Sequence, residues 1–212
     1  MNALKILGLL CSLAFLTQSA PTPEKLEDLE LKRNIQRARS LVNKILRLIP
    51  VVHGSCVSTN DLTIDPPSQP TDMQHQSLGT YSGIPTAPEL ETVCRPVNRI
   101  DFPLDECLNS ISAGLQLYQD VLGVLVLKVT SACQVTLLQA DIRDLLAQIN
   151  KMNESGLTSS GDQFDALVFA EGLRGDYEVQ VATHVTLLRL RNFTHDLKRS
   201  LRNVEHLSSK KS

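Results

Sequence analysis

The chain has 212 residues, 42% of them hydrophobic, and a formal net charge of −2 at pH 7. Trp is absent and aromatic residues make up only 4%, so a core must be built mainly from aliphatic side chains. Such a composition suits packed helices better than an aromatic-rich β-sandwich. The nearly balanced charge gives no indication of nucleic acid binding.

The first 19 residues have the pattern of a secretory signal peptide. Lys5 supplies a small basic region, and Ile6–Leu16 is an apolar run followed by small residues. We expect cleavage at the Ser19–Ala20 bond, because Pro21 disfavours a cut directly before it. The apolar run is too short for a membrane anchor, and no stop-transfer pattern follows. The sequence therefore predicts a secreted protein without membrane insertion.

Secretion bears on how the cysteines and two asparagines are interpreted. Cys11 leaves with the signal segment, and four cysteines in a secreted chain allow three pairings, among which the sequence alone does not choose. Two glycosylation sequons, Asn153-Glu-Ser and Asn192-Phe-Thr, fit the same compartment. The remaining cysteines are Cys56, Cys94, Cys107 and Cys133.

Residues 26–52 predict the first long helix, because apolar residues recur there at steps of three and four. Pro50 does not fit a helix interior, so we expect the regular helix to end near Ile49. The basic residues lie off the apolar stripe and form either a solvated face or a partner-binding face. The stripe is Leu31, Ile35, Ala38, Val42, Ile45, Ile49 and Val52, and the basic residues are Lys32, Arg33, Arg37, Arg39, Lys44 and Arg47.

Residues 53–102 form a long, proline-rich connection without sustained periodicity. A connection of this length between two helices is unusual and needs a reason. The reason is topological, because the chain must cross the whole bundle if the next long helix is to run parallel to the first.

Residues 103–129 predict a second long helix with the clearest apolar stripe. Pro103 suits a first helical turn, and Asp105 and Glu106 suit the positive end of the helix dipole. Polar side chains interrupt the segment throughout, so it is not a membrane span. The stripe is Leu104, Leu108, Ile111, Leu115, Tyr118, Leu122, Leu125 and Val129.

A third helix is expected over residues 133–153. The break before it, Thr130–Ala132, is so short that the second and third helices must be antiparallel. Asp141 and Asp144 lie one turn apart and should fall on the outer side together with Gln148. The buried stripe is Val135, Leu138, Ile142, Leu145, Leu146, Ile149 and Met152.

Residues 154–176 form a second long connection with a short apolar island, and the last helix follows over 176–207. The pattern of this helix is irregular near its start, so it either buries two faces there or begins later. The tail, 208–212, should be disordered. Leu187, Leu190, Phe193, Leu197, Leu201 and Val204 follow one face, whereas Val181, Val185 and Leu188 point elsewhere.

The order of connections predicts the fold class. Two long crossovers around one tight turn are typical of an all-α, up-up-down-down four-helix bundle, here spanning residues 20–207.

The sequence carries no motif of an enzyme. There is no His-Glu-x-x-His, Gly-x-Ser-x-Gly, phosphate-binding glycine loop or Cys-x-x-Cys. The histidines are scattered without paired spacing, so we expect no catalysis, no cofactor and no metal. They are His53, His75, His184, His195 and His206, of which His184 is expected to be packed or solvated.

Several segments resemble the granulocyte colony-stimulating factor family, a family of long-chain four-helix cytokines. The specific part runs from Leu78 to Gln119, with weaker agreement in the last two helices, and it suggests a divergent member from a non-mammalian vertebrate. The matching residues are Leu78-Gly79, Gly83-Ile84-Pro85, Ala87-Pro88, Cys94, Cys107, Ala113-Gly114-Leu115-Gln116-Leu117-Tyr118-Gln119 and Val181-Ala182-Thr183-His184.

The resemblance has consequences for the cysteines. It implies that Cys94 pairs with Cys107 and so fixes the crossover to the start of the second long helix. The family closes a small second loop after its first helix, whereas this chain has only Cys56 there. Cys56 could bond Cys133, stay free or pair between molecules, and the intramolecular pair is weakly favoured.

The resemblance also implies receptor-binding residues. The family uses acidic residues of its third helix, and Asp141 and Asp144 match that pattern, although they could equally be ordinary solvated carboxylates. On the first helix the family places an acidic residue where this chain has Lys32-Arg33, which suggests a receptor that has co-varied. In a second, weaker patch, Gln74 stands where the family has glutamate, and Phe169 is comparable to its crossover aromatic.

By resemblance, the chain would bind and dimerise a class I cytokine receptor ectodomain, as two ligands with two receptors, and stimulate granulocyte and myeloid cells. Another long-chain cytokine with a different receptor is the alternative within the class. A secreted lipid-binding helical protein is the alternative from another class, but the specific crossovers, the cysteines and the lack of a tandem repeat favour the cytokine.

Overall fold

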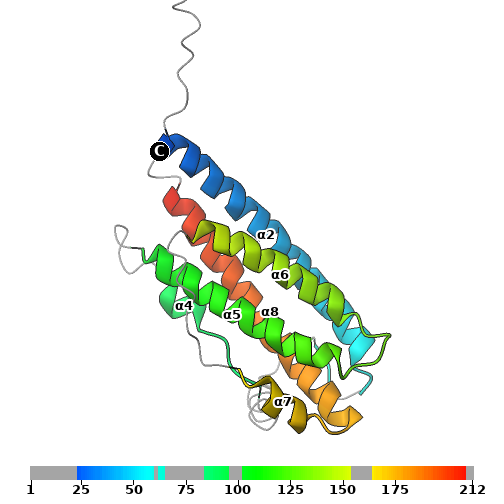
Figure 1. Ribbon diagram of the computed structural model, residues 1–212. Helices are drawn as coiled ribbons and strands as arrows, with labels where there is room; N and C mark the ends of the chain where they lie inside the picture. Colours follow the sequence, from blue (N-terminus) through cyan, green and yellow to red (C-terminus); the bar gives the residue numbers. More distant parts are fainter. Residues whose placement is uncertain (1–22, 60–61, 65–83, 96–101, 154–163, 209–212) are drawn as a thin grey trace, which may run out of the picture.

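The computed structural model describes residues 23–59, 62–64, 84–95, 102–153 and 164–208, so the predicted signal peptide lies outside the described residues. The described part is helical and contains no strand (Figure 1). Every described helix is too short or too polar to span a membrane. The helices are α2 (Pro23–Cys56), α4 (Leu90–Val93), α5 (Leu104–Val126), α6 (Val135–Met152), α7 (Ala166–Gly172) and α8 (Asp176–Ser208).

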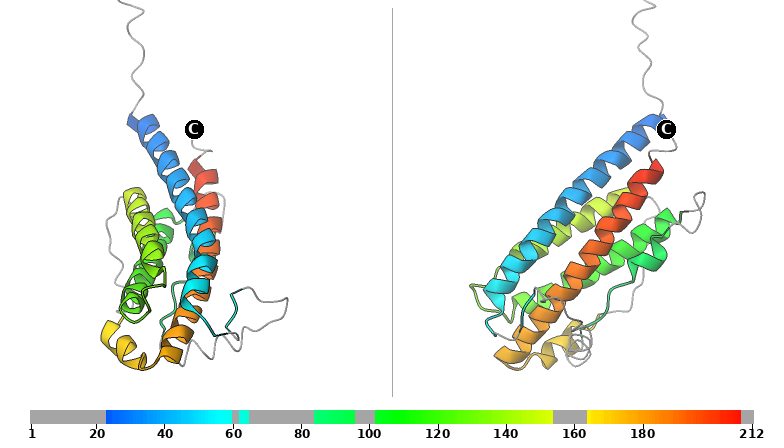
Figure 2. Two further views of the ribbon diagram at one scale, coloured as in Figure 1. Left: turned by 90° about the vertical axis from the view of Figure 1, so that its right-hand side faces the viewer. Right: turned by 180° about the vertical axis from the view of Figure 1, so that it is seen from behind.

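The four long helices pack in two layers, one formed by α2 and α8 and the other by α5 and α6 (Figure 2). α6 also packs extensively against α2, and α5 against α8. In cross-section the long helices therefore occupy four corners, with α2 diagonal to α5 and α6 diagonal to α8. This arrangement is a helical bundle, as the sequence predicts.

Contacts between side chains give the relative directions of α2 and its neighbours. Lys44 of α2 contacts Asp141 of α6, and Cys56 at the end of α2 contacts Cys133 just before α6. The residue numbers therefore rise along α2 as those of the contacting residues on the α6 side fall. Against α8, His53 Nε2 lies 2.9 Å from His184 Nδ1, whereas Arg39, earlier in α2, contacts Glu205. α2 is therefore antiparallel to both α6 and α8.

α5 and α6 are also antiparallel, as their short connection predicts. Ser112 Oγ donates to Asn150 Oδ1 at 2.8 Å near one end of the pair. Further along, Gln139 Nε2 donates to the Gln119 carbonyl oxygen at 3.4 Å.

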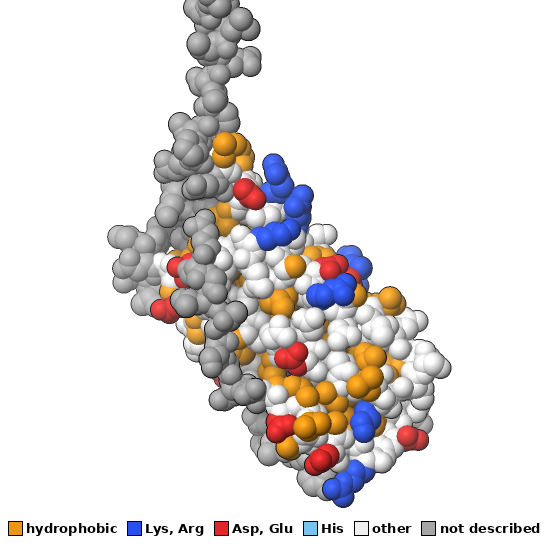
Figure 3. Space-filling model, in the orientation of Figure 1, with side chains coloured by type: hydrophobic (Ala, Val, Ile, Leu, Met, Phe, Trp, Pro, Cys, Tyr) orange, Lys and Arg blue, Asp and Glu red, His pale blue; other side chains and the backbone are white. Residues whose placement is uncertain are grey.

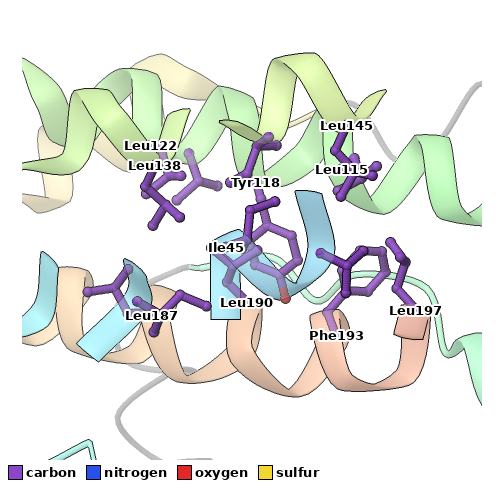
Figure 4. Close-up of a cluster of buried hydrophobic side chains, with 14 of the residues drawn as sticks. Ile45, Leu115, Tyr118, Leu122, Leu138, Leu145, Leu187, Leu190, Phe193 and Leu197 are labelled. Atoms are coloured by element: carbon purple, nitrogen blue, oxygen red, sulfur yellow. The ribbon is translucent and has the colours of Figure 1, made fainter. Parts of the chain in front are cut away.

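The core lies between the two layers and is mainly aliphatic (Figure 4). The predicted stripes of all four long helices supply it, with Leu31, Leu104, Val129 and Leu146 only half-buried at its margins. Burying an aliphatic side chain contributes about 1.5–3 kcal/mol, so this shared core is the largest favourable contribution to the fold. Its central members include Ile45, Leu115, Tyr118, Leu122, Leu138, Leu145, Leu187, Leu190, Phe193 and Leu197.

The close approach of α5 and α8 depends on a glycine. Phe193 of α8 packs against Tyr118 of α5, with ring centroids 5.4 Å apart. Its ring also lies directly over Gly114, where an added Cβ would overlap the ring atoms Cε2 and Cζ. Gly114 therefore makes room for the aromatic contact.

The first helix is longer than the sequence predicts. We expected regular helix to end near Ile49, but α2 continues through Pro50 to Cys56. Pro50 is exposed, so the backbone carbonyl that it leaves without a partner can meet water. Beyond it, Val52 and His53 are buried and Cys56 is bonded to Cys133, and these contacts hold the last turn in place.

α5 is shorter than predicted at its C-terminal end. Residues 127–129 form a tight turn, in which Leu127 N–H donates to the Val124 carbonyl at 3.2 Å and Lys128 N–H donates to that of Leu125 at 2.9 Å. Leu127 is 83% exposed, so little burial favours another helical turn.

The two-face alternative for the last helix is the correct one. α8 begins at Asp176, and every residue from Val181 to Leu187 is buried. The chain after α2 adds cover to this part of α8, because Gln180 Oε1 accepts a hydrogen bond from the Thr59 N–H at 3.1 Å. α8 includes Ser208, which was predicted to be the first residue of the tail, and residues 209–212 lie outside the described part.

Arginines of α8 hold the first crossover to the bundle. Arg191 Nη1 donates to the Ile64 carbonyl at 2.6 Å, and Arg189 Nη1 donates to that of Ile84 at the same distance. In these described segments the backbone carbonyls therefore accept charge-assisted hydrogen bonds from α8 in place of hydrogen bonds from water.

Two cysteine pairs lie at disulfide distance. Cys94 and Cys107 have Cα atoms 4.9 Å apart, as the family resemblance implies. The Cα atoms of Cys56 and Cys133 are 4.6 Å apart, so the structure favours the intramolecular pair among the three alternatives for Cys56. One bridge joins α4 to α5, and the other joins the end of α2 to the chain before α6.

Replacing Gly114 by Ala should lower the free energy of unfolding by up to about 2 kcal/mol. Overpacking against Phe193 costs about 1–3 kcal/mol and outweighs the gain of about 1 kcal/mol in helix propensity. Gly54→Ala in α2 is the matched control, because an added Cβ there meets nothing within 4 Å and should stabilise by about 0.5–1 kcal/mol. Urea denaturation followed by circular dichroism measures both, and a stabilising Gly114→Ala would contradict the close approach.

The two disulfides should contribute unequally to stability. Cys56 and Cys133 are 77 residues apart and Cys94 and Cys107 only 13. In the chain-entropy model these loops correspond to about 4.5 and about 3 kcal/mol. We expect Cys56→Ser/Cys133→Ser to lower the urea unfolding free energy more than Cys94→Ser/Cys107→Ser. The reverse order would contradict the model for this fold.

Candidate functional site

The candidate surface lies on α2 and α6, which are neighbours in the bundle. The structure brings together on this pair of helices five of the seven residues predicted to bind a receptor. Lys32 is half-buried and Arg33 is exposed, both in the N-terminal half of α2. The other three are Asp141, Asp144 and Gln148 of α6.

The three α6 residues do not share an outer face, contrary to our expectation. Asp144 is exposed, with 59% of its side chain accessible. Asp141 is only 5% exposed, and Gln148 is half-buried with its Oε1 enclosed. The prediction is therefore wrong for Asp141, because α6 packs against α2 as well as α5 and so buries a wider arc than its apolar stripe.

Asp141 forms an ion pair between the two helices. Lys44 Nζ of α2 donates to Asp141 Oδ1 at 2.5 Å, while the Lys44 side chain keeps 59% of its surface accessible. The second oxygen, Oδ2, is enclosed without a hydrogen-bond partner among the described residues. The pair thus fixes α2 against α6, and this contact was not predicted because it joins residues far apart in the sequence.

Asp144 is the carboxylate of α6 that a partner can reach. Its only close cation within the described residues is Arg143, with Nε 3.7 Å from Oδ1, and both side chains are largely exposed. Exposed ion pairs of this kind contribute about 0–1 kcal/mol, so Asp144 can exchange this contact for one with a binding partner.

Of the two residues predicted for the second patch, only Phe169 lies within the described residues, and it is buried. Gln74 lies outside the described residues. Phe169 of α7 is only 3% exposed and packs against Phe164, with ring centroids 5.5 Å apart, so it belongs to the core. Leu167 and Val168 on the same short helix are exposed instead. All three side chains are apolar, so the sequence does not indicate which of them faces the core.

The two sequon asparagines have different environments. Asn192 is exposed on α8. Asn153 directly follows α6 and is half-buried, and its Nδ2, the atom that would carry a glycan, donates to Asn109 Oδ1 at 2.6 Å. Asn192 is therefore the more accessible of the two acceptors in the folded chain.

Two groups have shifted pKa values. Burial raises the pKa of Tyr118, which lies in the core and stays protonated. The pKa of His195 on α8 is lowered, first by its partial burial and then by the positive charges of Arg191, Lys198 and Arg199. His195 therefore adds no positive charge to α8 at neutral pH.

The described residues include no group of three or more His, Cys, Asp or Glu side chains placed to hold a metal ion. Comparisons with the models of known protein families and with curated protein sequences find no match to this chain.

Breaking the ion pair from one side should destabilise the bundle. Lys44→Met leaves the buried Asp141 carboxylate without its partner and should lower the free energy of unfolding by about 1–3 kcal/mol. Adding Asp141→Leu removes the buried charge as well, so the double variant should be more stable than Lys44→Met alone. A double-mutant cycle by urea denaturation measures this, and strictly additive losses would contradict the pairing.

Proposed function

We propose that this protein is a secreted cytokine of the granulocyte colony-stimulating factor type that binds and dimerises a class I cytokine receptor ectodomain. In this proposal two ligands hold two receptors together, and the signal drives proliferation and differentiation of granulocyte and myeloid cells. The protein itself supplies shape and charge and carries out no chemical reaction.

The observation that carries the proposal is the arrangement of the long helices. α6 opposes both α2 and α5, and α8 opposes α2, so α2 and α5 have one direction and α6 and α8 the other. The connections between α2 and α5 and between α6 and α8 are long, while that between α5 and α6 is short. This combination supports an up-up-down-down topology, which the long-chain cytokines share.

The disulfide-distance cysteine pairs support an extracellular location. Structural disulfides persist in oxidising compartments and are rare in the cytosol. The pairs Cys56–Cys133 and Cys94–Cys107 brace helix ends, which is typical of small secreted domains. Together with the signal-peptide pattern of residues 1–19, they favour secretion, and exposed Asn192 is then the favoured glycosylation site.

The α2–α6 surface is the proposed receptor site. It presents Arg33 of α2 and Asp144 of α6, with Lys32 and Gln148 half-buried beside them. In this proposal Asp141 positions α6 through its ion pair with Lys44 and does not contact the receptor. Charges at such an interface act mainly on the association rate and on specificity.

Binding of the mature chain to the ectodomain of a granulocyte colony-stimulating factor receptor tests the proposal. Asp144→Lys should weaken binding about tenfold or more, which is about 1.4 kcal/mol, chiefly through slower association. Asp120→Lys, an equal charge reversal at an exposed position of α5, is the control and should leave affinity nearly unchanged. Surface plasmon resonance gives both rate constants.

Each outcome has a distinct consequence. Tight binding without an effect of Asp144→Lys would keep the receptor and reject this site. A folded chain that binds no class I receptor but gains helix content on phospholipid vesicles would reject the proposal in favour of a lipid-binding protein. A cooperative thermal transition that vesicles do not change would exclude that alternative.

A further inference from the structure

The charges of α2 are strongly one-sided. Between Leu31 and Cys56 the helix carries six Lys and Arg residues and no Asp or Glu, although the whole chain has a formal net charge of −2. Such a concentration of one sign on a single helix creates a local positive field that the net charge of the protein conceals.

Four of these cations form a line. Arg33, Arg37, Lys44 and Arg47 follow one another at steps of four, seven and three residues, which keeps them on one side of an α-helix. All four are exposed, and at about 1.5 Å per residue the line is about 20 Å long. Figure 3 shows Lys and Arg side chains gathered over the N-terminal half of α2. We call these four residues the α2 basic stripe.

Most of the stripe has no ion-pair partner among the side chains that the structure describes. Lys44 pairs with Asp141, and Arg39, which lies off the stripe, contacts Glu205. Among the described side chains, none forms an ion pair with Arg33, Arg37 or Arg47. Glu30, three residues before Arg33 on α2, and Asp144 on α6 are exposed carboxylates of the same two helices.

We propose that the α2 basic stripe binds a sulfated polysaccharide. Three of its members are arginines, whose planar guanidinium groups match the geometry of oxyanions such as sulfate. A line of cations about 20 Å long complements a linear polyanion better than a compact anion. The stripe does not insert into an anionic bilayer, because the apolar face of α2 is buried in the core.

This inference does not depend on the identity of the receptor. It needs only an extracellular chain, since sulfated polysaccharides are the abundant polyanions of that compartment. Binding there would retain the protein near cell surfaces. Arg33 belongs both to the stripe and to the proposed receptor site, so polysaccharide and receptor would compete at the start of α2.

The test measures binding of the folded, mature chain to a size-defined heparin oligosaccharide at several NaCl concentrations. The variant Arg33→Gln/Arg37→Gln/Arg47→Gln should weaken binding about tenfold or more and reduce the slope of log affinity against log salt by about two to three. Arg95→Gln/Lys128→Gln/Arg174→Gln removes the same charge from exposed positions outside α2 and should change affinity by less than about threefold. Circular dichroism and urea denaturation verify that both variants are folded.

Two results would overturn the proposal. One is equal loss of affinity in the two triple variants, which would mean that net charge and not the stripe governs binding. The other is absence of heparin binding by the native chain at about 0.15 M salt. If the stripe variant then loses receptor affinity instead, the α2 basic stripe belongs to an acidic protein partner.

Discussion

α6 packs against α2 on one side and α5 on the other, and most features of the molecule depend on this double contact. Because the connection after α5 is short, α6 must run antiparallel to α5 and pack beside it. The Cys56–Cys133 pair then fixes the start of α6 beside the end of α2, and the Lys44–Asp141 ion pair fixes it about halfway along. With α6 held at this corner, the remaining space is filled by α8, in which every residue from Val181 to Leu187 is buried.

The same double contact decides which charges the protein presents. Packing of α6 on α2 removes Asp141 from the surface and leaves Asp144 as the accessible carboxylate of that face. It also leaves one side of α2 exposed beside α6, and the α2 basic stripe runs along that side, where Lys44 reaches Asp141. The exposed acidic residue Asp144 and the α2 basic stripe therefore lie on neighbouring helices.

The described parts of the crossovers are held by a few polar contacts, by a disulfide-distance cysteine pair and by apolar side chains that enter the shared core. Arg189 and Arg191 of α8 bind backbone carbonyls of the first crossover, and the Cys94–Cys107 pair ties its short helix α4 to α5. In the second crossover, the N-terminal turn of α7 is capped by Asp165, while Phe169 anchors the helix in the core. A long connection anchored in this way can carry exposed apolar side chains such as Leu167 without losing its position.

The sequence by itself determined the long helices, their buried stripes and the antiparallel return of α6, because apolar periodicity and connection length are local properties of the chain. It also indicated the start of α5 to within one residue, since Pro103 is the N-cap of that helix and Asp105 and Glu106 lie in its first turn. Only the tertiary structure decided that α2 continues past Pro50, since contacts from other helices hold its last turn. Likewise, whether Asp141, Asp144 or Phe169 faces solvent depends on which neighbours cover each helix. Those neighbours are distant in sequence, so no local pattern encodes them.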